Sequence, residues 1–202
     1  ELANGLKIAT RSMPHATTLS VGIWVNAGAR DEGDHEQGIA HMLEHMAFKG
    51  TKRRDAQAIA TEVENVGGFM NAHTSREETA YYLRLLPEHI DLCVDILADI
   101  LTESTLPDLE IERERGVIIQ EIGQSLDTPD DLVFDLFSAA CYDGHTLGRP
   151  ILGTVDSVSA FRQQDLEAFL RRHYGAGQML VCAAGSVDHD DLVQRIGARL
   201  GH

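Results

Sequence analysis

The alternation of apolar and polar residues along the chain predicts a sheet of short strands. Strands are expected at residues 6–10, 17–26, 69–75, 79–86 and 179–185, where apolar side chains alternate or form a short buried run. Met13-Pro14-His15 favours a turn that would pair the first two strands. Arg76-Glu77-Glu78 separates the next two, an arrangement typical of a hairpin.

Apolar residues at three- and four-residue spacing predict helices between these strands. The helical segments are residues 38–50, 56–66, 87–101, 107–122, 129–140, 160–174 and 188–200. Their apolar stripes are expected to face the core, including Val133, Leu136 and Phe137 in the helix that Pro129 opens. Because helices and antiparallel hairpins are intermixed, the pattern predicts an α+β fold with helices packed on one mainly antiparallel sheet.

Length and composition are those of one globular domain. The 202 residues are 43% hydrophobic and 24% charged, which suffices for a buried core. The net charge of −15 argues against a nucleic-acid partner and favours cationic ligands such as basic peptides, although a solvated surface explains the charge equally well. Cys93, Cys141 and Cys182 lie far apart in apolar surroundings and are expected to be reduced core residues.

Targeting signals constrain the location of the protein only loosely. No apolar segment is long enough for a membrane span, and no signal peptide is recognisable. We therefore expect a cytoplasmic location in a bacterium. The chain starts at Glu1 without a methionine, so a leader could have been removed, which leaves the periplasm and the mitochondrial matrix open.

Two histidines in residues 38–50 carry the candidate chemistry. His41 and His45 lie one helical turn apart, so their imidazoles can point at one metal ion. Glu44 lies on nearly the same face, where it can reach a water molecule on that ion and act as a general base. For these residues taken alone, a chance pair on a solvated helix face is an equally good interpretation.

Two glutamates in a later helix strengthen the metal interpretation. Glu114 and Glu121 share a mostly apolar helical stripe, and buried carboxylates need partners. A divalent ion held by two neutral histidines is such a partner, and two histidines with one glutamate and an open fourth position form the ligand set of a hydrolytic zinc site. Seven helical residues rise about 10 Å, so one glutamate is expected to bind the ion and the other to support it from outside.

This pattern resembles the inverted zinc-binding motif of the pitrilysin and insulysin metallopeptidases. The motif is His41-x-x-Glu44-His45, followed after a long gap by Glu121 with Glu114 seven residues before it. Flanking residues are most similar to the mitochondrial-processing-peptidase branch and its bacterial relatives. They are residues 4–6, 45–51, 67–68, 71–72, 74–75 and 147–153, so the resemblance covers essentially the whole chain.

The resemblance implies a zinc-dependent endopeptidase that hydrolyses extended peptides or presequence-like segments. His41, His45 and Glu121 would bind one Zn²⁺ per chain, and the candidate catalytic residues are Glu44 as base and Glu114 as the supporting acidic residue. A non-catalytic structural or partner subunit of the same fold is the alternative. Such members usually lose motif residues, whereas this chain retains both histidines and all three carboxylates.

The resemblance also implies that residues 1–202 form a single catalytic zinc-binding domain, the amino-terminal half of a two-half peptidase. A homologous carboxy-terminal half or partner subunit would then close over the peptide. The resemblance is also compatible with a homo-oligomer.

The polar strand at residues 69–75 is the candidate substrate-binding element. An extended peptide could add to its edge, although polar edge strands also serve simply to prevent aggregation. The resemblance favours substrate docking at five consecutive residues. These are Asn71, Ala72, His73, Thr74 and Ser75. His73 stands where relatives commonly carry an aromatic residue.

Overall fold

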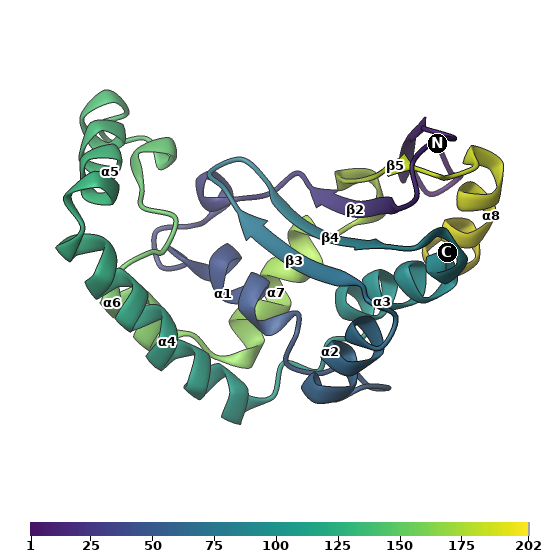
Figure 1. The fold of residues 1–202 in the computed structure, drawn as a ribbon. Coiled ribbons are helices and arrows are strands. Elements are labelled where there is room, and N and C mark those ends of the chain that lie inside the picture. Colours follow the sequence, from purple (N-terminus) through teal and green to yellow (C-terminus); the bar gives the residue numbers. More distant parts are fainter. Residues whose placement is uncertain (202) are drawn as a thin grey trace.

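Five strands form one sheet in the computed structural model, which describes residues 1–201 (Figure 1). They are β1 (Lys7–Ser12), β2 (Leu19–Val25), β3 (Phe69–Thr74), β4 (Thr79–Leu85) and β5 (Met179–Gly185), in the spatial order β1-β5-β2-β4-β3. Only β1 and β5 pair in parallel, while the other neighbours are antiparallel. The predicted α+β fold on a mainly antiparallel sheet is therefore confirmed.

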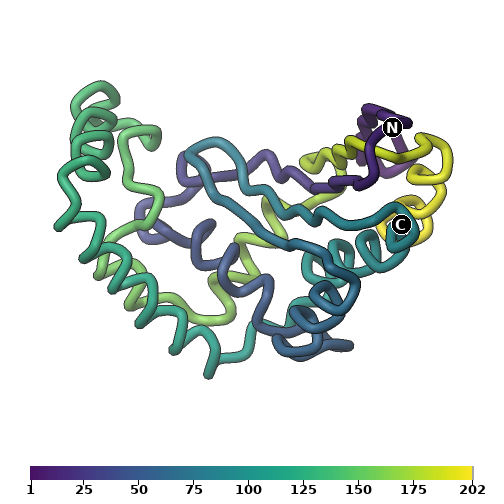
Figure 2. The backbone as a smooth tube through the Cα atoms, in the orientation of Figure 1, coloured from purple at the N-terminus to yellow at the C-terminus, as the bar shows by residue number. Residues whose placement is uncertain are grey.

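Helices cover one face of this sheet and then extend beyond it. They are α1 (Ile39–Met46), α2 (Ala56–Glu64), α3 (Ile90–Thr102), α4 (Asp108–Asp127), α5 (Pro129–Cys141), α6 (Val155–Ala160), α7 (Gln163–His173) and α8 (His189–Leu200). In Figure 1, α1, α2, α3 and α7 lie beneath the sheet, and α4 and α5 form an arm that curves away from it. The backbone trace in Figure 2 shows the same open curve. None of the helices in residues 1–201 combines the length and apolar character of a membrane span.

The first two strands do not pair with each other as the sequence pattern predicts. β5 lies between them, parallel to β1 and antiparallel to β2. Residues 13–18 link β1 to β2, and these six residues can cross the two strand spacings of about 10 Å that this insertion requires. β5 carries buried Val181 and Ala183, and insertion pairs both of its edges with other strands.

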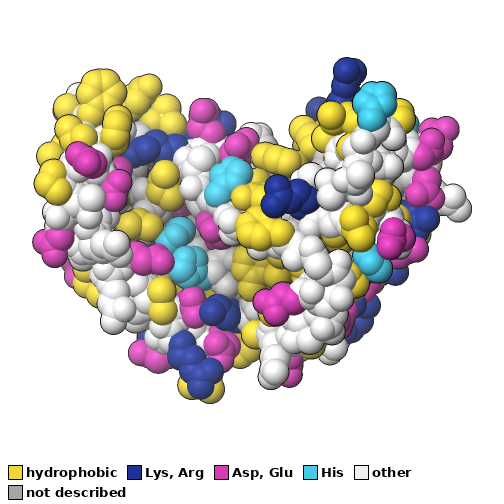
Figure 3. All heavy atoms as spheres, in the orientation of Figure 1, with side chains coloured by type: hydrophobic (Ala, Val, Ile, Leu, Met, Phe, Trp, Pro, Cys, Tyr) yellow, Lys and Arg dark blue, Asp and Glu magenta, His cyan; other side chains and the backbone are white. Residues whose placement is uncertain are grey.

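The apolar stripe of α5 is exposed, which contradicts the prediction that it faces the core. Val133, Phe134, Leu136 and Phe137 are between 54% and 69% exposed, and no residue of α5 is buried. Figure 3 shows hydrophobic side chains gathered over α5 at the upper left. Helical periodicity predicts an apolar face, but it does not specify that the same chain covers that face.

The cysteine prediction is correct for only one of the three residues. Cys93 is buried, and burial raises the pKa of its thiol to about 12. Cys182 is half-buried and Cys141 is exposed, so neither is a core residue. All three are free thiols, as expected for reduced cysteines.

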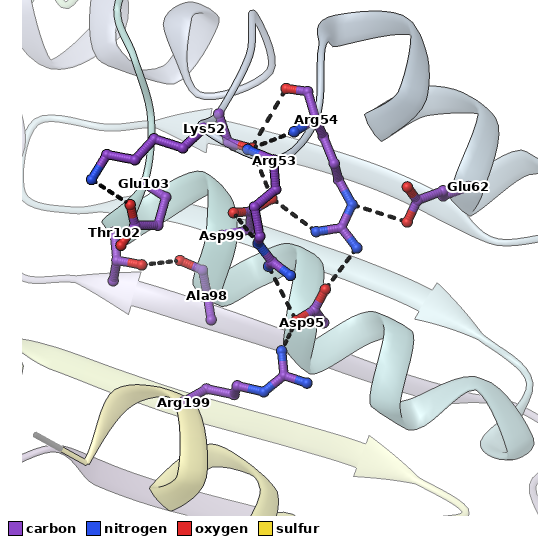
Figure 4. A network of polar contacts seen from close by, with 11 residues as sticks. Lys52, Arg53, Arg54, Glu62, Asp95, Ala98, Asp99, Thr102, Glu103 and Arg199 are labelled. Carbon is purple, nitrogen blue, oxygen red and sulfur yellow. Dashed lines mark hydrogen bonds and ion pairs between the residues drawn. The ribbon is translucent and has the colours of Figure 1, made fainter.

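A buried ion-pair network anchors the turn that follows α1 to α3 (Figure 4). The Asp99 side chain is fully buried and accepts hydrogen bonds from Thr51, Arg53 and Arg54 at 2.8–3.0 Å. Burial alone would raise the pKa of Asp99, yet these hydrogen bonds hold it below its usual value. Arg54 also contacts Asp95 at 2.6 Å. The network thus fixes the chain shortly after α1 has delivered its side chains to the candidate site.

Candidate metal centre

The start of α1 is held by a buried carboxylate and a glycine. Gly38 adopts φ 90°, a left-handed conformation that glycine accepts without strain. The backbone N–H groups of Gly38 and Ala40 donate to Glu32 at 2.9 and 3.0 Å, which satisfies donors at the helix start. Burial raises the pKa of Glu32 to about 8, although these backbone hydrogen bonds oppose the shift.

The buried face of α1 determines where its chemistry points. Ile39, Ala40, Met42, Leu43 and Met46 are buried in the core. His41, Glu44 and His45 are only half-buried and occupy the remaining face. The helix is therefore amphipathic, and its partly exposed side carries two imidazoles and a carboxylate instead of the usual solvated charges.

His41, His45 and Glu121 come together although α1 and α4 are far apart in the sequence. One candidate ligand atom from each lies within 4.8 Å of the others. Glu121 Oε2 is 3.8 Å from His41 Nε2 and 3.7 Å from His45 Nε2. Two ligands about 2.1 Å from a tetrahedral zinc ion lie about 3.4 Å apart, so this spacing is close to that of a formed site.

Unsatisfied polar atoms support the same interpretation. Glu121 Oε2 is buried and has no hydrogen-bond partner among the described residues. Buried carboxylate oxygens rarely stay without a partner, because their desolvation is costly. An ion between this oxygen and the two imidazole nitrogens would supply the missing partner, so the donor set and its spacing fit Zn²⁺.

Glu114 contacts His45 from the other side of the ring. Its Oε2 lies 2.9 Å from His45 Nδ1, and its Oε1 lies 2.7 Å from Lys49 Nζ. When the Nδ1–H group of His45 donates a hydrogen bond to Glu114, the Nε2 atom is unprotonated and its lone pair faces Glu121. Burial alone would raise the pKa of Glu114, but hydrogen bonds from Lys49 and His45 hold it below the usual value. Sequence reasoning assigned no role to Lys49, which carried no signal of its own.

Glu44 opens onto a cleft beside this cluster. The cleft is lined by His41, Glu44, His73, Thr74, Ser125, Asp131, Phe134, Asp135, Ile151 and Leu152. Asp135 pairs with Arg76 at 2.8 Å, whereas the Asp131 carboxylate forms no ion pair within residues 1–201. Neither aspartate was singled out from the sequence, where Asp131 resembles an ordinary acidic residue in the first turn of a helix.

The five predicted substrate-binding residues occupy different environments around β3. β3 is at the edge of the sheet and, within residues 1–201, pairs only with β4. His73 and Thr74 line the cleft, while Asn71 is exposed and Ala72 is buried. Ser75 accepts the backbone N–H groups of Glu77 and Glu78, so its hydroxyl shapes the turn of the hairpin. A role for these residues in binding substrate stays a prediction.

The metal-free protein is expected to lose stability between pH 6.5 and pH 4 because of His41. Burial, followed by repulsion from His45, lowers the pKa of His41 from 6.5 to about 4. The unfolded chain therefore binds a proton in this range that the folded chain excludes, and the free energy of unfolding falls as the pH falls. A shift of this size corresponds to about 3 kcal/mol.

Urea unfolding of the metal-free protein at pH 7 and at pH 4 would measure this loss. His41→Phe, which cannot titrate, is the control and should lose less stability over the same range. Equal losses in the two proteins would contradict the buried, neutral state of His41.

Known proteins resemble this chain over nearly all of its length. The family model described as Insulinase (Peptidase family M16) matches residues 7–155. Mitochondrial-processing peptidase subunit beta of Saccharomyces cerevisiae is 45% identical over 202 residues, which are 100% of this chain and 44% of that protein. A protein of Rickettsia felis named as an uncharacterized zinc protease is 43% identical over 193 residues, 96% of this chain and 47% of that protein. The chain thus spans less than half the length of these relatives.

Solved structures agree on the fold. A protease from Helicobacter pylori superposes with a TM-score of 0.94 at 25% identity, over 99% of this chain and 49% of that one. A peptidase M16 inactive domain from Pseudomonas fluorescens gives 0.90 at 19% identity, over 100% and 50%, which shows a shared fold alone. The match of the family model over most of the chain establishes the kinship, and the chain therefore belongs to the insulinase family, peptidase family M16.

Proposed function

We propose that this chain is the catalytic half of a zinc-dependent endopeptidase that hydrolyses extended peptides or presequence-like segments. One observation carries the proposal. A Glu121 oxygen that is buried and has no partner among residues 1–201 faces the Nε2 atoms of His41 and His45 at zinc-ligand spacing. Glu44 opens onto the adjoining cleft, where a general base is needed.

The metal and the side chains around it would each have a separate role in the reaction. His41, His45 and Glu121 would hold Zn²⁺, which supplies Lewis-acid activation of water when bound. Glu44 would take a proton from the attacking water and return it to the leaving amine. Glu114 would fix the ring of His45 through its contact with Nδ1. Each role uses a side chain that lies in or against the cluster.

The substrate is expected to bind as an added strand. β3 offers a free edge, and an extended peptide paired with it would pass His73 and Thr74 at the cleft. Thr74 lines this cleft, and its Oγ1 is buried without a partner in the described part of the chain. Asp131 and the net charge of −15 favour a peptide with basic residues.

A second half is expected to complete the enzyme. The relatives are about twice as long as this chain, and the cleft is lined by residues of β3 on one side and of α4 and α5 on the other. A homologous carboxy-terminal half or a partner subunit would close this cleft over the peptide. The fold by itself does not imply activity, since the inactive domain from Pseudomonas fluorescens shares it. This chain has all the candidate metal ligands, the candidate base and the supporting glutamate, which favours the catalytic role.

Zinc analysis combined with a cleavage assay tests the proposal. We expect about one zinc per chain after equilibrium dialysis. Cleavage of a basic extended peptide should be slow for this chain and faster when the carboxy-terminal half is supplied. A peptide of the same length in which acidic residues replace the basic ones is the control for the charge preference. Absence of zinc binding at micromolar concentrations would overturn the proposal.

A further inference from the structure

Lys49 contacts the carboxylate that holds His45, although it binds no candidate ligand itself. It follows α1 by three residues, and its Nζ lies 2.7 Å from Glu114 Oε1. The second oxygen of the same carboxylate contacts His45 Nδ1 at 2.9 Å. Lys49, Glu114 and His45 therefore form one continuous chain of charge-assisted hydrogen bonds that ends at a candidate zinc ligand.

Burial makes this arrangement sensitive to each of its members. Glu114 is only 6% exposed, so solvent offers its carboxylate little compensation if a partner is removed. Lys49 is the cation that pairs with Glu114, and it occupies the oxygen that does not contact His45. With both oxygens occupied, the carboxylate has one favoured rotation. That rotation directs an acceptor at His45 Nδ1 and leaves Nε2 facing Glu121.

We propose that Lys49 is a positioning residue for metal binding, which acts through Glu114 to fix the orientation and tautomer of the His45 ring. This inference rests on the proposed zinc site and extends it to a residue outside the ligand set. Partners of this kind that orient a ligand typically change metal affinity by about 10–100-fold when they are removed.

The sign of the effect separates positioning from simple electrostatics. A lysine ammonium near a divalent cation repels it, so removal of the charge alone would strengthen zinc binding. Loss of the restraint on Glu114 and His45 would instead weaken zinc binding. Weaker zinc binding by a variant without the Lys49 charge can therefore not be explained by the loss of electrostatic repulsion.

The test measures zinc affinity by competition with a chromophoric chelator in three variants. Lys49→Met keeps the length of the side chain without its charge, and Lys49→Arg restores a cation. Lys52→Met is the matched control, because Lys52 lies three residues further along the chain and pairs with Glu103 rather than with Glu114. We expect zinc affinity to fall about 10–100-fold in Lys49→Met, to recover largely in Lys49→Arg, and to stay unchanged in Lys52→Met.

Two further measurements exclude a role in stability alone. Ring ¹⁵N shifts of His45 in the metal-free protein should report the Nδ1–H tautomer in the unaltered chain and a mixture of tautomers in Lys49→Met. In a Glu114→Gln background, Lys49→Met should lower zinc affinity by about twofold or less, because the two residues act in series.

Zinc binding by Lys49→Met that equals or exceeds that of the unaltered chain would overturn the inference and leave the zinc site itself intact. A lower melting temperature with unchanged zinc affinity and unchanged ¹⁵N shifts would do the same, because it would assign Lys49 to the fold only. Failure of the unaltered chain to bind zinc would instead refute the proposed site.

Discussion

Glu44→Gln is expected to lower peptide hydrolysis by about 10²-fold or more while the zinc content stays unchanged. Glutamine keeps the size and polarity of the side chain but cannot accept a proton from water. Glu44 makes no ion pair within residues 1–201 and opens onto the cleft, so its substitution should leave the metal cluster undisturbed. Hydrolysis should be measured with the carboxy-terminal half supplied, and zinc by atomic absorption on the same sample.

Glu36→Gln provides a control for the loss of a carboxylate near α1. Glu36 pairs with Arg172 and lies outside the cleft, so this variant should retain the cleavage rate. Unchanged cleavage by Glu44→Gln in the reconstituted enzyme would remove Glu44 from the mechanism. Loss of zinc from Glu44→Gln would instead make it a ligand.

Glu121→Gln and Glu114→Gln are expected to affect zinc binding very differently. Glu121 faces both Nε2 atoms, so the neutral amide should remove a ligand and reduce zinc affinity by more than about 10²-fold. Glu114 contacts the opposite nitrogen of His45, and its substitution should reduce affinity by only about 10–100-fold. Isothermal titration at fixed pH would measure both.

His45→Ala serves as the reference for complete loss of the site, because two remaining ligands hold an ion weakly. Glu112→Gln serves as the neutral reference on α4, since its carboxylate pairs with Arg115 at an exposed position. Reversal of the order, with Glu114→Gln the weaker zinc binder, would exchange the roles that we give to the two glutamates. Stoichiometric zinc in His45→Ala would remove the proposed site altogether.

Sequence patterns predicted best those parts of the fold that depend on neighbouring residues. The cap before α2 and the proline of α5 predicted where these helices begin, because such signals act within one turn, whereas Pro87 opens a 3₁₀ turn and α3 begins only at Ile90. The hairpin of β3 and β4 followed from its own turn. Insertion of β5 between β1 and β2 was missed, since nothing within residues 6–26 indicates a strand that arrives more than 150 residues later.

In the candidate site, too, the residues on one helix were predicted and the contacts between separate elements were missed. His41, Glu44 and His45 lie on one helix, and helical geometry alone predicted that they share a face. The distinction between Glu114 and Glu121 came from resemblance, and in the structure they contact opposite nitrogens of the His45 ring. Lys49 and Asp131 were missed because their environments depend on contacts between separate elements. Exposure of α5 was missed for a related reason, since periodicity does not specify a partner.

The insertion of β5 has a consequence for the order in which the molecule can be completed. All candidate ligands lie within residues 41–121, so they are synthesised before β5 emerges at residue 179. Until then β1 and β2 lack their common neighbour, and each carries an unpaired edge. Closure of the sheet is a late event of high contact order, and the sheet against which α1 packs is completed only then. The nascent chain therefore holds a complete set of metal ligands before it holds the frame that fixes their geometry.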